Sequence, residues 1–283
     1  MPDVAIRPMR EEDAIDANRV CIEVLYPPGG DEEEPTQLAR RLARIHHLRE
    51  TDPGGAWVAE RDGRVEGVAL AFVREGIWGF SLLAVSDALQ GTGTGRELFA
   101  RAWAYGASAR GHLILSSTHP AAMRTYARTG LSIRPCVAAA GIPDLSRAPG
   151  VDGVEEAGDA GVEVADAIGR EVRGAGHARD LPVALAHGAR LFVCRDRAFG
   201  VLRNTGVLML AARDEDSAQR VLWALLAAAG PGATVNVDFL TAGQDWAVKV
   251  VLDAGLPLSP DGPMFAGGAL GPLAPYIPSG AYL

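Results

Sequence analysis

Residues 90–96 read Gln-Gly-Thr-Gly-Thr-Gly-Arg and join an apolar strand pattern at 77–85 to a helical pattern near Leu98. Glycines let backbone N–H groups approach a ligand closely, and the start of a helix adds partial positive charge. A strand, a glycine loop and a helix in this order can cradle a phosphate group. This segment therefore predicts an α/β fold with a mixed sheet and an anion-binding loop.

Two familiar phosphate-binding loops do not fit these residues. The Walker loop needs Gly-Lys before Ser or Thr, but the only lysine of the chain is Lys249. The Rossmann loop needs glycine at its first, third and sixth places. Counted from Gly91 the sixth place is Arg96, and counted from Gly93 it is Leu98. Both loops are therefore excluded.

Apolar periodicity predicts the elements around the loop. A strand at 4–7 precedes two amphipathic helices that end before the Pro/Gly breakers at 27–30 and 52–55, and Asp62-Gly63 is typical of a hairpin turn. The order is β-α-α-β-β-β before the loop and α-β-α after it, with strands at 56–60, 65–73, 77–85 and 112–117 and a last helix at 119–129.

Two motifs on these elements resemble the GCN5-related N-acetyltransferase (GNAT) superfamily. Val85, Gln90, Gly93 and Gly95 fill the pattern Gln/Arg-x-x-Gly-x-Gly/Ala after a strand. Residues 122–131 resemble the second signature of the family, A-x-x-x-Y-x-x-x-G-F, with Leu in place of Phe at its end. The order of elements over roughly residues 3–136 is similar to that of the family too, so the resemblance covers the first half of the chain.

The resemblance implies acetyl-CoA as co-substrate and a role for each matching residue. Backbone amides of the loop would bind the pyrophosphate, and the end of the preceding strand would pair with the pantetheine arm and the acetyl carbonyl. Tyr126 would protonate the departing thiolate, and His119 would contact substrate or CoA. The cofactor-binding residues so implied are Leu83, Ala84, Val85, Gln90, Gly91, Thr92, Gly93, Thr94, Gly95 and Arg96.

The acceptor site and its general base are less defined by the residues. The family often places a glutamate near its fourth strand, but residues 79–85 hold no carboxylate. The nearby titratable candidates are Glu23, His46, His47, Glu75 and His119. Asp31, Glu32, Glu33 and Glu34 join the two helices that border the acceptor site in the family, so an acidic rim there would attract a cationic amine.

The order β-β-β-α-β-α recurs after residue 161, which indicates an internal repeat of topology. In this half the glycine loop becomes 212–218, without glycine and with three acids, and Val251 takes the tyrosine place. The sequence therefore predicts two GNAT-like domains: 1–140 with the acetyl-CoA loop, a Gly/Pro/acid-rich linker at 141–160, and a degenerate domain at 161–283. Tyr276, Ile277 and Tyr282 of the tail either fray or dock into a groove.

Composition limits the partners. A net charge of -8 argues against a general nucleic-acid binder, and no apolar stretch reaches the ~20 residues of a membrane span. Three scattered cysteines, Cys21, Cys136 and Cys194, favour neither a disulfide framework nor a zinc site, so we expect no metal and a reducing cytoplasm. A monomer and a homodimer both remain open.

The function implied is an N-acetyltransferase that moves an acetyl group directly from acetyl-CoA to a primary amine of a small molecule or peptide. A catalytically inactive acyl-CoA-binding sensor or scaffold is the alternative, because one half is degenerate and no base is evident. A third possibility is an acyltransferase that uses a longer CoA thioester.

Overall fold

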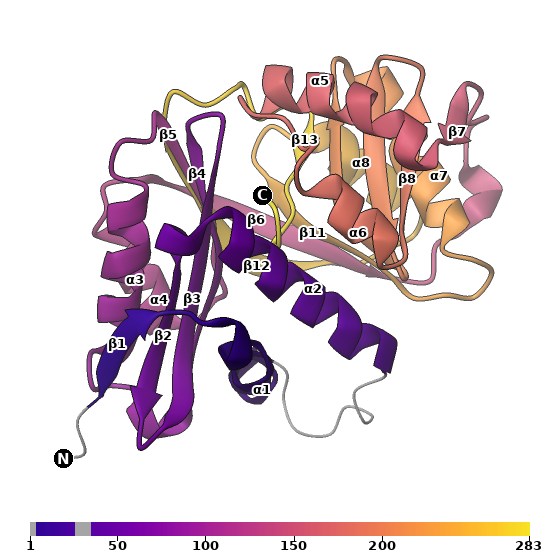
Figure 1. Cartoon of the computed structure of the whole chain (residues 1–283). Coiled ribbons are helices and arrows are strands. Elements are labelled where there is room, and N and C mark those ends of the chain that lie inside the picture. The colour runs from indigo at the N-terminus through magenta and orange to yellow at the C-terminus, as the bar shows by residue number, and fades with distance from the viewer. Residues whose placement is uncertain (1–3, 26–34) are drawn as a thin grey trace. The chain divides into compact units, whose positions relative to one another are not determined.

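The computed structural model describes residues 4–25 and 35–283. The chain divides into two compact units, Met1–Ala109 and Arg110–Leu283, and each is described by itself. Figure 1 shows the helices and strands of both units.

The first unit is an antiparallel sheet with three helices. Its strands lie in the order β1-β2-β3-β4, and each neighbouring pair is antiparallel. The turn between β2 and β3 has positive φ at Asp62 (53°) and Gly63 (75°), as the predicted hairpin requires. The elements are β1 (Ala5–Pro8), α1 (Ala14–Leu25), α2 (Pro35–Thr51), β2 (Ala56–Arg61), β3 (Arg64–Arg74), β4 (Ile77–Val85) and α3 (Thr94–Tyr105).

Helices cover both faces of this sheet, with α1 and α2 on one face and α3 on the other (Figure 1). An aromatic cluster joins α3 to β4. The Trp78 and Phe80 rings stack at 5.5 Å, and Phe99 meets Phe80 edge-on at 5.1 Å. Trp78 also donates its indole N–H to the carbonyl of Ala102 at 3.1 Å. These contacts join the first half of β4 to the middle and second half of α3, the two elements that flank the glycine loop.

The second unit is a mixed sheet in the order β5-β12-β6-β11-β10-β9-β8-β7, with β13 paired to β10. Its core packs α7 and α8 against these strands through Val221, Leu225, Trp246 and Val250, all fully or almost fully buried. The elements are β5 (Gly111–Leu115), α4 (Pro120–Ala127), β6 (Ser132–Gly141), β7 (Val154–Glu156), α5 (Val162–Val172), α6 (Leu181–Ala186), β8 (Ala189–Cys194), β9 (Ala198–Arg203), β10 (Gly206–Ala212), α7 (Glu215–Ala228), β11 (Val235–Thr241), α8 (Asp245–Asp253), β12 (Leu258–Gly268) and β13 (Tyr276–Ile277).

The predicted repeat of element order is present. The order β-β-β-α-β-α-β occurs over Ala56–Gly141, which we name the first repeat, and again over Ala189–Gly268, the second repeat. By order, α7 corresponds to α3, β10 to β4, and α8 to α4. The repeat thus lets each local feature of the predicted acetyl-CoA site be compared with its counterpart.

Strand β12 lies between β5 and β6 and pairs antiparallel with both. Phe265 of β12 is opposite Ile114 on one side and Ile133 on the other. β6 in turn pairs with β11. The last strand of each repeat therefore pairs with the fourth strand of the other repeat.

This strand exchange explains where the compact units divide. The predicted domains were 1–140 and 161–283, whereas the units meet at Ala109 and Arg110, because β5 and β6 are held by β12. The predicted linker at 141–160 also contains β7, which pairs with β8. Sequence patterns missed β12 because Ser-Pro-Asp-Gly-Pro at 259–263 is typical of a turn.

The tail docks rather than frays. Tyr276, Ile277, Tyr282 and Leu283 are at most 3% exposed. Arg173, itself 1% exposed, donates to the carbonyls of Tyr282 (2.8 Å) and Leu283 (2.5 Å). Of the two predicted alternatives for the tail, the structure selects docking, and it does so within the second unit.

Candidate acetyl-CoA site

The glycine loop starts where β4 ends at Val85 and stops at the first turn of α3. Gln90 donates its side-chain amide to the carbonyl of Val85 at 3.2 Å and to Asp87 at 2.8 Å. The Thr92 hydroxyl donates to the carbonyl of Leu89 at 2.7 Å. These bonds hold the loop against the strand end.

Two glycines of the loop adopt backbone conformations that other residues reach only with strain. Gly91 has φ 75° and Gly93 has φ 96°. A Cβ atom at Gly91 would have no heavy atom within 4 Å, so the glycine is required by the backbone angle and not by lack of space. The resulting turn directs the chain from the strand into α3.

The start of α3 is left open by this turn. Gly93 is the N-cap residue and offers no side-chain acceptor. Within the described residues, the backbone N–H groups of Gly93, Gly95 and Arg96 have no hydrogen-bond partner. Such groups, together with the helix dipole, favour a bound anion. A pyrophosphate therefore fits the residues present.

A cavity of about 320 Å³ adjoins the loop. The loop and the first turn of α3 line it with Thr92, Gly93, Thr94, Arg96 and Glu97, and the Glu97 carboxylate is 3.5 Å from Arg101. Residues Val4 and Ile6 of the β1 region complete the lining. The Arg96 guanidinium contributes positive charge where the loop faces this space.

Residues Leu83, Ala84 and Val85, predicted to contact the pantetheine arm, form the last part of β4. Ala84 and Val85 are buried and Leu83 is partly exposed. All three pair with β3, opposite Ala69, Val68 and Gly67 respectively.

A bulge interrupts β4 before these residues. Leu82 pairs with Leu70 and Phe80 with Ala71, so Ser81 is an extra residue relative to β3. Arg44 of α2 donates to both the hydroxyl and the carbonyl oxygen of Ser81. Sequence reasoning singled out neither residue. The contact depends on how α2 crosses the sheet, which a sequence does not reveal.

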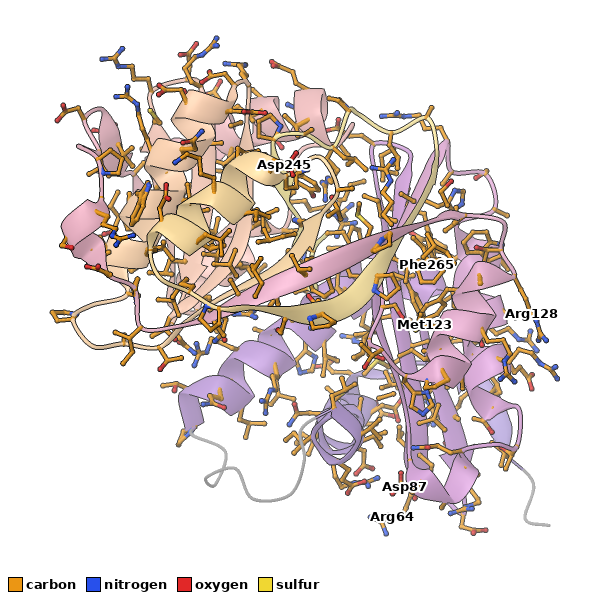
Figure 2. All side chains as sticks on the ribbon, turned by 180° about the vertical axis from the view of Figure 1, so that it is seen from behind. Arg64, Asp87, Met123, Arg128, Asp245 and Phe265 are labelled. Atoms are coloured by element: carbon orange, nitrogen blue, oxygen red, sulfur yellow. The ribbon has the colours of Figure 1, made fainter. Side chains whose placement is uncertain are left out.

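Tyr126 and His119, the two catalytic predictions, lie in the second unit at opposite ends of α4. Tyr126 is 5% exposed and meets the Phe265 ring of β12 edge-on at 5.7 Å. Burial raises the pKa of its phenol above its ordinary value of 10, so the hydroxyl keeps its proton. Figure 2 labels Phe265 together with Met123 and Arg128 of the α4 region.

His119 is exposed and forms the N-cap of α4 without a side-chain bond. Its backbone N–H donates to the Ser117 hydroxyl at 3.3 Å. Gly130, φ 82°, follows the helix in the position predicted for its end. The second signature thus forms a short helix whose tyrosine points into packed side chains and whose histidine is accessible.

The acceptor-side predictions fall in different places. Asp31, Glu32, Glu33 and Glu34 lie outside the described residues. Glu75 is exposed in the turn before β4, at the opposite end of that strand from the loop. Of the other base candidates, Glu23 pairs with Arg19 at 3.0 Å, while His46 and His47 lie on α2, partly exposed.

No group of three or more His, Cys, Asp or Glu in the described part of the chain could hold a metal ion. Likewise, no helix among residues 4–25 and 35–283 is both long and apolar enough to span a bilayer. All three cysteines are buried and free.

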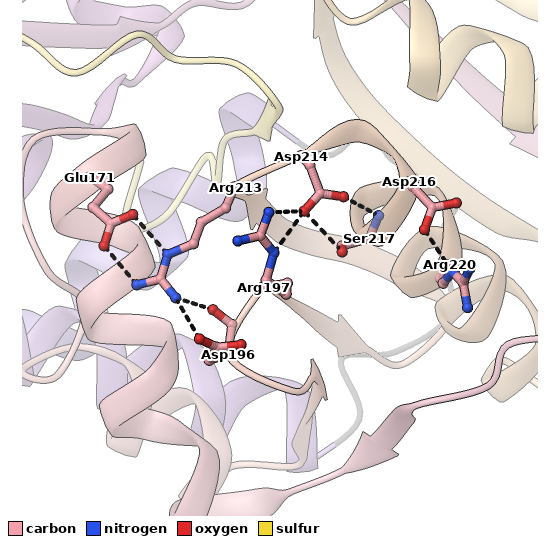
Figure 3. A network of polar contacts seen from close by, with 8 residues as sticks. All are labelled: Glu171, Asp196, Arg197, Arg213, Asp214, Asp216, Ser217 and Arg220. Carbon is pink, nitrogen blue, oxygen red and sulfur yellow. Dashed lines mark hydrogen bonds and ion pairs between the residues drawn. The ribbon is translucent and has the colours of Figure 1, made fainter.

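The second repeat closes the counterpart of the glycine loop with a carboxylate. Asp214 is the N-cap of α7 and accepts from the Ser217 backbone N–H at 2.8 Å. The same carboxylate pairs with Arg197 at 2.8 Å. Figure 3 shows these contacts within a wider network in which Arg213 links Glu171 to Asp196. The position that is open at α3 therefore already holds a negative charge at α7.

The tail pairs with β10 where β10 and β11 separate. β10 and β11 are parallel and pair only at Gly206 and Val207, beyond which they separate. Ile277 of β13 pairs antiparallel with Leu210, whose other edge is taken by Gly200 of β9. β13 therefore occupies the β11 side of β10, in the gap between the two parallel strands.

Comparisons with known proteins identify the first repeat. The GNAT acetyltransferase domain model matches residues 52–130, which include the first predicted motif and all but the last residue of the second. Among curated proteins, none matches the sequence at a significant level.

Solved structures share the fold at low sequence identity. A proposed acetyltransferase from Pyrococcus horikoshii is 17% identical with a TM-score of 0.81, covering 99% of this chain and 96% of its own. A GCN5-related N-acetyltransferase from Sphaerobacter thermophilus is 14% identical with a TM-score of 0.57, covering 95% and 96%. One from Kribbella flavida is 15% identical with a TM-score of 0.58, covering 93% and 71%.

The expected fold class, a mixed α/β sheet flanked by helices, is confirmed by these likenesses. GNAT domains use acetyl-CoA as co-substrate, which agrees with the open start of α3 at Gly93. Residues 52–130 therefore match the acetyltransferase domain of the GNAT family, as the glycine loop and the Tyr126 motif predicted.

Proposed function

We propose that the protein is an acetyl-CoA-dependent N-acetyltransferase that acts on a primary amine of a small molecule or peptide. The observation that carries the proposal is the start of α3, where Gly93 leaves backbone N–H groups without an acceptor in the described chain. These donors and the helix dipole bind the pyrophosphate. The end of β4, at Leu83, Ala84 and Val85, lies beside the thioester arm.

The chemistry is a direct transfer within a ternary complex. The amine lone pair attacks the carbonyl carbon of the thioester, and the C–S bond then breaks. Tyr126 donates its proton to the departing thiolate, and the amine loses its extra proton to water or to a nearby base. Burial raises the pKa of the Tyr126 phenol, so the hydroxyl carries its proton at neutral pH. His119, exposed at the start of α4, contacts the substrate or CoA.

In this proposal the second repeat binds no cofactor. The Asp214 carboxylate stands at the start of α7, where it repels a pyrophosphate, and β13 fills the gap beside β10. This repeat is a degenerate GNAT-like domain whose last strand, β12, completes the sheet between β5 and β6. Three free, buried cysteines agree with a reducing compartment such as the cytoplasm.

Thiol release from acetyl-CoA in the presence of amine panels tests the proposal, with CoA binding measured in parallel by calorimetry. We expect amine-dependent release and one CoA per chain. Tight CoA binding without release from any small or peptide amine would favour the alternative, a non-catalytic acyl-CoA sensor. Faster release from propionyl- or longer thioesters than from acetyl-CoA would instead identify an acyltransferase of longer chains.

A further inference from the structure

A side chain from α2 contacts the bulge of β4. Ser81 is 6% exposed, and as the extra residue of the bulge its backbone stands outside the regular ladder with β3. Arg44 Nη2 donates to the Ser81 carbonyl oxygen at 2.5 Å and to its hydroxyl at 2.8 Å, while Nε donates to the same hydroxyl at 3.1 Å. Three charge-assisted bonds thus fix both the side chain and the backbone of one residue.

The Arg44 guanidinium bonds to a serine, which is uncharged. Among residues 4–25 and 35–283, Arg44 makes no ion pair with a carboxylate, although its side chain is partly buried. The nearby Cys21 thiol offers no negative charge either, because burial raises its pKa to about 11 against the opposing effect of Arg44 and Arg41. Partly buried arginines commonly pair with a carboxylate, whereas Arg44 bonds to the hydroxyl and the carbonyl oxygen of a strand residue.

The position of the bulge gives the contact a function. Ser81 immediately precedes Leu82 and Leu83, and the latter begins the part of β4 that we place beside the thioester. A guanidinium bonded to a peptide carbonyl also polarises that peptide group, and a displacement of about 1 Å at a reacting centre costs up to about 100-fold in rate.

We propose that Arg44 is a positioning residue for acetyl transfer: it clamps the Ser81 bulge so that β4 presents its backbone to the thioester carbonyl in the reactive geometry. The proposal rests on the proposed function, since it assigns Arg44 to the same site. Arg44 acts through Ser81 and does not line the cavity beside Gly93.

Kinetics of Arg44→Met, Arg44→Lys and Arg44→Ala test the proposal, with Arg40→Met as control. Arg40 lies on the same helix, and its Nε donates to the Thr36 carbonyl of that helix. We expect Arg44→Met to lower kcat by about 10-fold to 100-fold while the Kd for CoA changes less than about threefold. Arg44→Lys recovers part of the rate, and guanidinium ion added to Arg44→Ala recovers more than added ammonium does.

Hydrogen exchange of the backbone amides in residues 77–85 provides a readout without turnover. We expect faster exchange at the bulge in Arg44→Met than in Arg40→Met. Wild-type turnover together with an unchanged kcat in Arg44→Met would overturn this proposal alone, as would a loss of rate matched by an equal loss of CoA affinity. A wild type that binds CoA but never releases thiol would overturn the proposed function, and with it the positioning role of Arg44.

Discussion

Asp214 caps α7 by accepting a 2.8 Å hydrogen bond from the backbone N–H of Ser217. At the corresponding start of α3, Gly93 offers no side chain and leaves its helix open. One chain thus contains two versions of the same strand-to-helix turn. The turn before α3 leaves backbone N–H groups open to an external anion, whereas the turn before α7 is capped by the Asp214 carboxylate.

Replacing Asp214 with Ala should destabilise the protein without altering CoA binding. Loss of an N-cap carboxylate costs about 0.5–2 kcal/mol of unfolding free energy, and the ion pair with Arg197 is lost as well. Urea unfolding measures the first effect and calorimetry the second. A change in CoA stoichiometry or affinity would contradict the assignment of the second repeat as a non-binding domain.

Replacing Gly93 with Asp should abolish CoA binding, because a carboxylate would take the place of the pyrophosphate and repel it. Gly188→Asp is the matched control: Gly188 has φ 88°, close to the 96° of Gly93, and a Cβ there meets nothing within 4 Å. Both variants carry the same charge and similar backbone strain. Equal CoA affinity in the two, measured by calorimetry, would remove the loop from the site.

Replacing Tyr126 with Phe should lower kcat by about 100-fold while CoA affinity is kept, if its phenol is the general acid. Tyr105→Phe is the control, since this tyrosine donates to Asp52 at 3.0 Å and stands outside the proposed chemistry. Thiol release at saturating acetyl-CoA measures the effect. A Tyr126→Phe rate equal to that of Tyr105→Phe would assign Tyr126 to packing against Phe265.

Acid should destabilise the second unit through His177. Burial, reinforced by Arg173, holds the pKa of this fully buried histidine well below its ordinary value of 6.5, with Asp180 acting in the opposite direction. Below pH 6.5 His177 therefore binds a proton in the unfolded chain but not in the folded chain. The resulting stability is present above pH 6.5 and is lost as pH falls, by about 1.4 kcal/mol at pH 5.5.

Urea unfolding between pH 7.5 and 5.5 measures this loss. His177→Leu should flatten the pH dependence, whatever its effect on absolute stability. The same substitution at His187, which is partly exposed, should leave the wild-type slope in place. Identical slopes in the two variants would show that His177 does not carry the effect.

Replacing Gly262 with Ala should destabilise the strand exchange. A Cβ at Gly262 of β12 would stand 1.8 Å from the Ser116 carbonyl oxygen, so β12 or the end of β5 must shift. Forced overpacking of this kind costs about 1–3 kcal/mol. At Gly280 the nearest atom to a Cβ is 3.6 Å away, on Phe239, so Gly280→Ala should unfold like the wild type.

Local signals in the sequence predicted the elements on which the candidate site rests. Asp62-Gly63 predicted a hairpin, and the glycine loop around Gly93 predicted the turn that leads into a helix. Both turns need positive φ angles, which Gly and Asp adopt more readily than most residues. The GNAT family was recognisable for the same reason, since its two motifs at Gln90–Gly95 and 122–131 are continuous segments.

Contacts between distant segments could not be predicted in this way. β12 and β6 find each other across more than a hundred residues, and the turn-like residues at 259–263 conceal the strand between them. The Arg44–Ser81 contact depends on the crossing of a helix over a sheet. The Gly/Pro-rich tail gave no periodic signal, yet Ile277 pairs with β10, because strand pairing needs backbone groups and not a side-chain pattern.

The insertion of β12 has a consequence for biosynthesis. β5 and β6 emerge from the ribosome long before Leu258–Gly268 is translated, and until then neither has the neighbour it needs. During this time the edges of β5 and β6 that pair with β12 are uncovered, and such strand edges are sites of misassociation. Late synthesis of a single strand thus sets the earliest moment at which the acetyltransferase domain can mature.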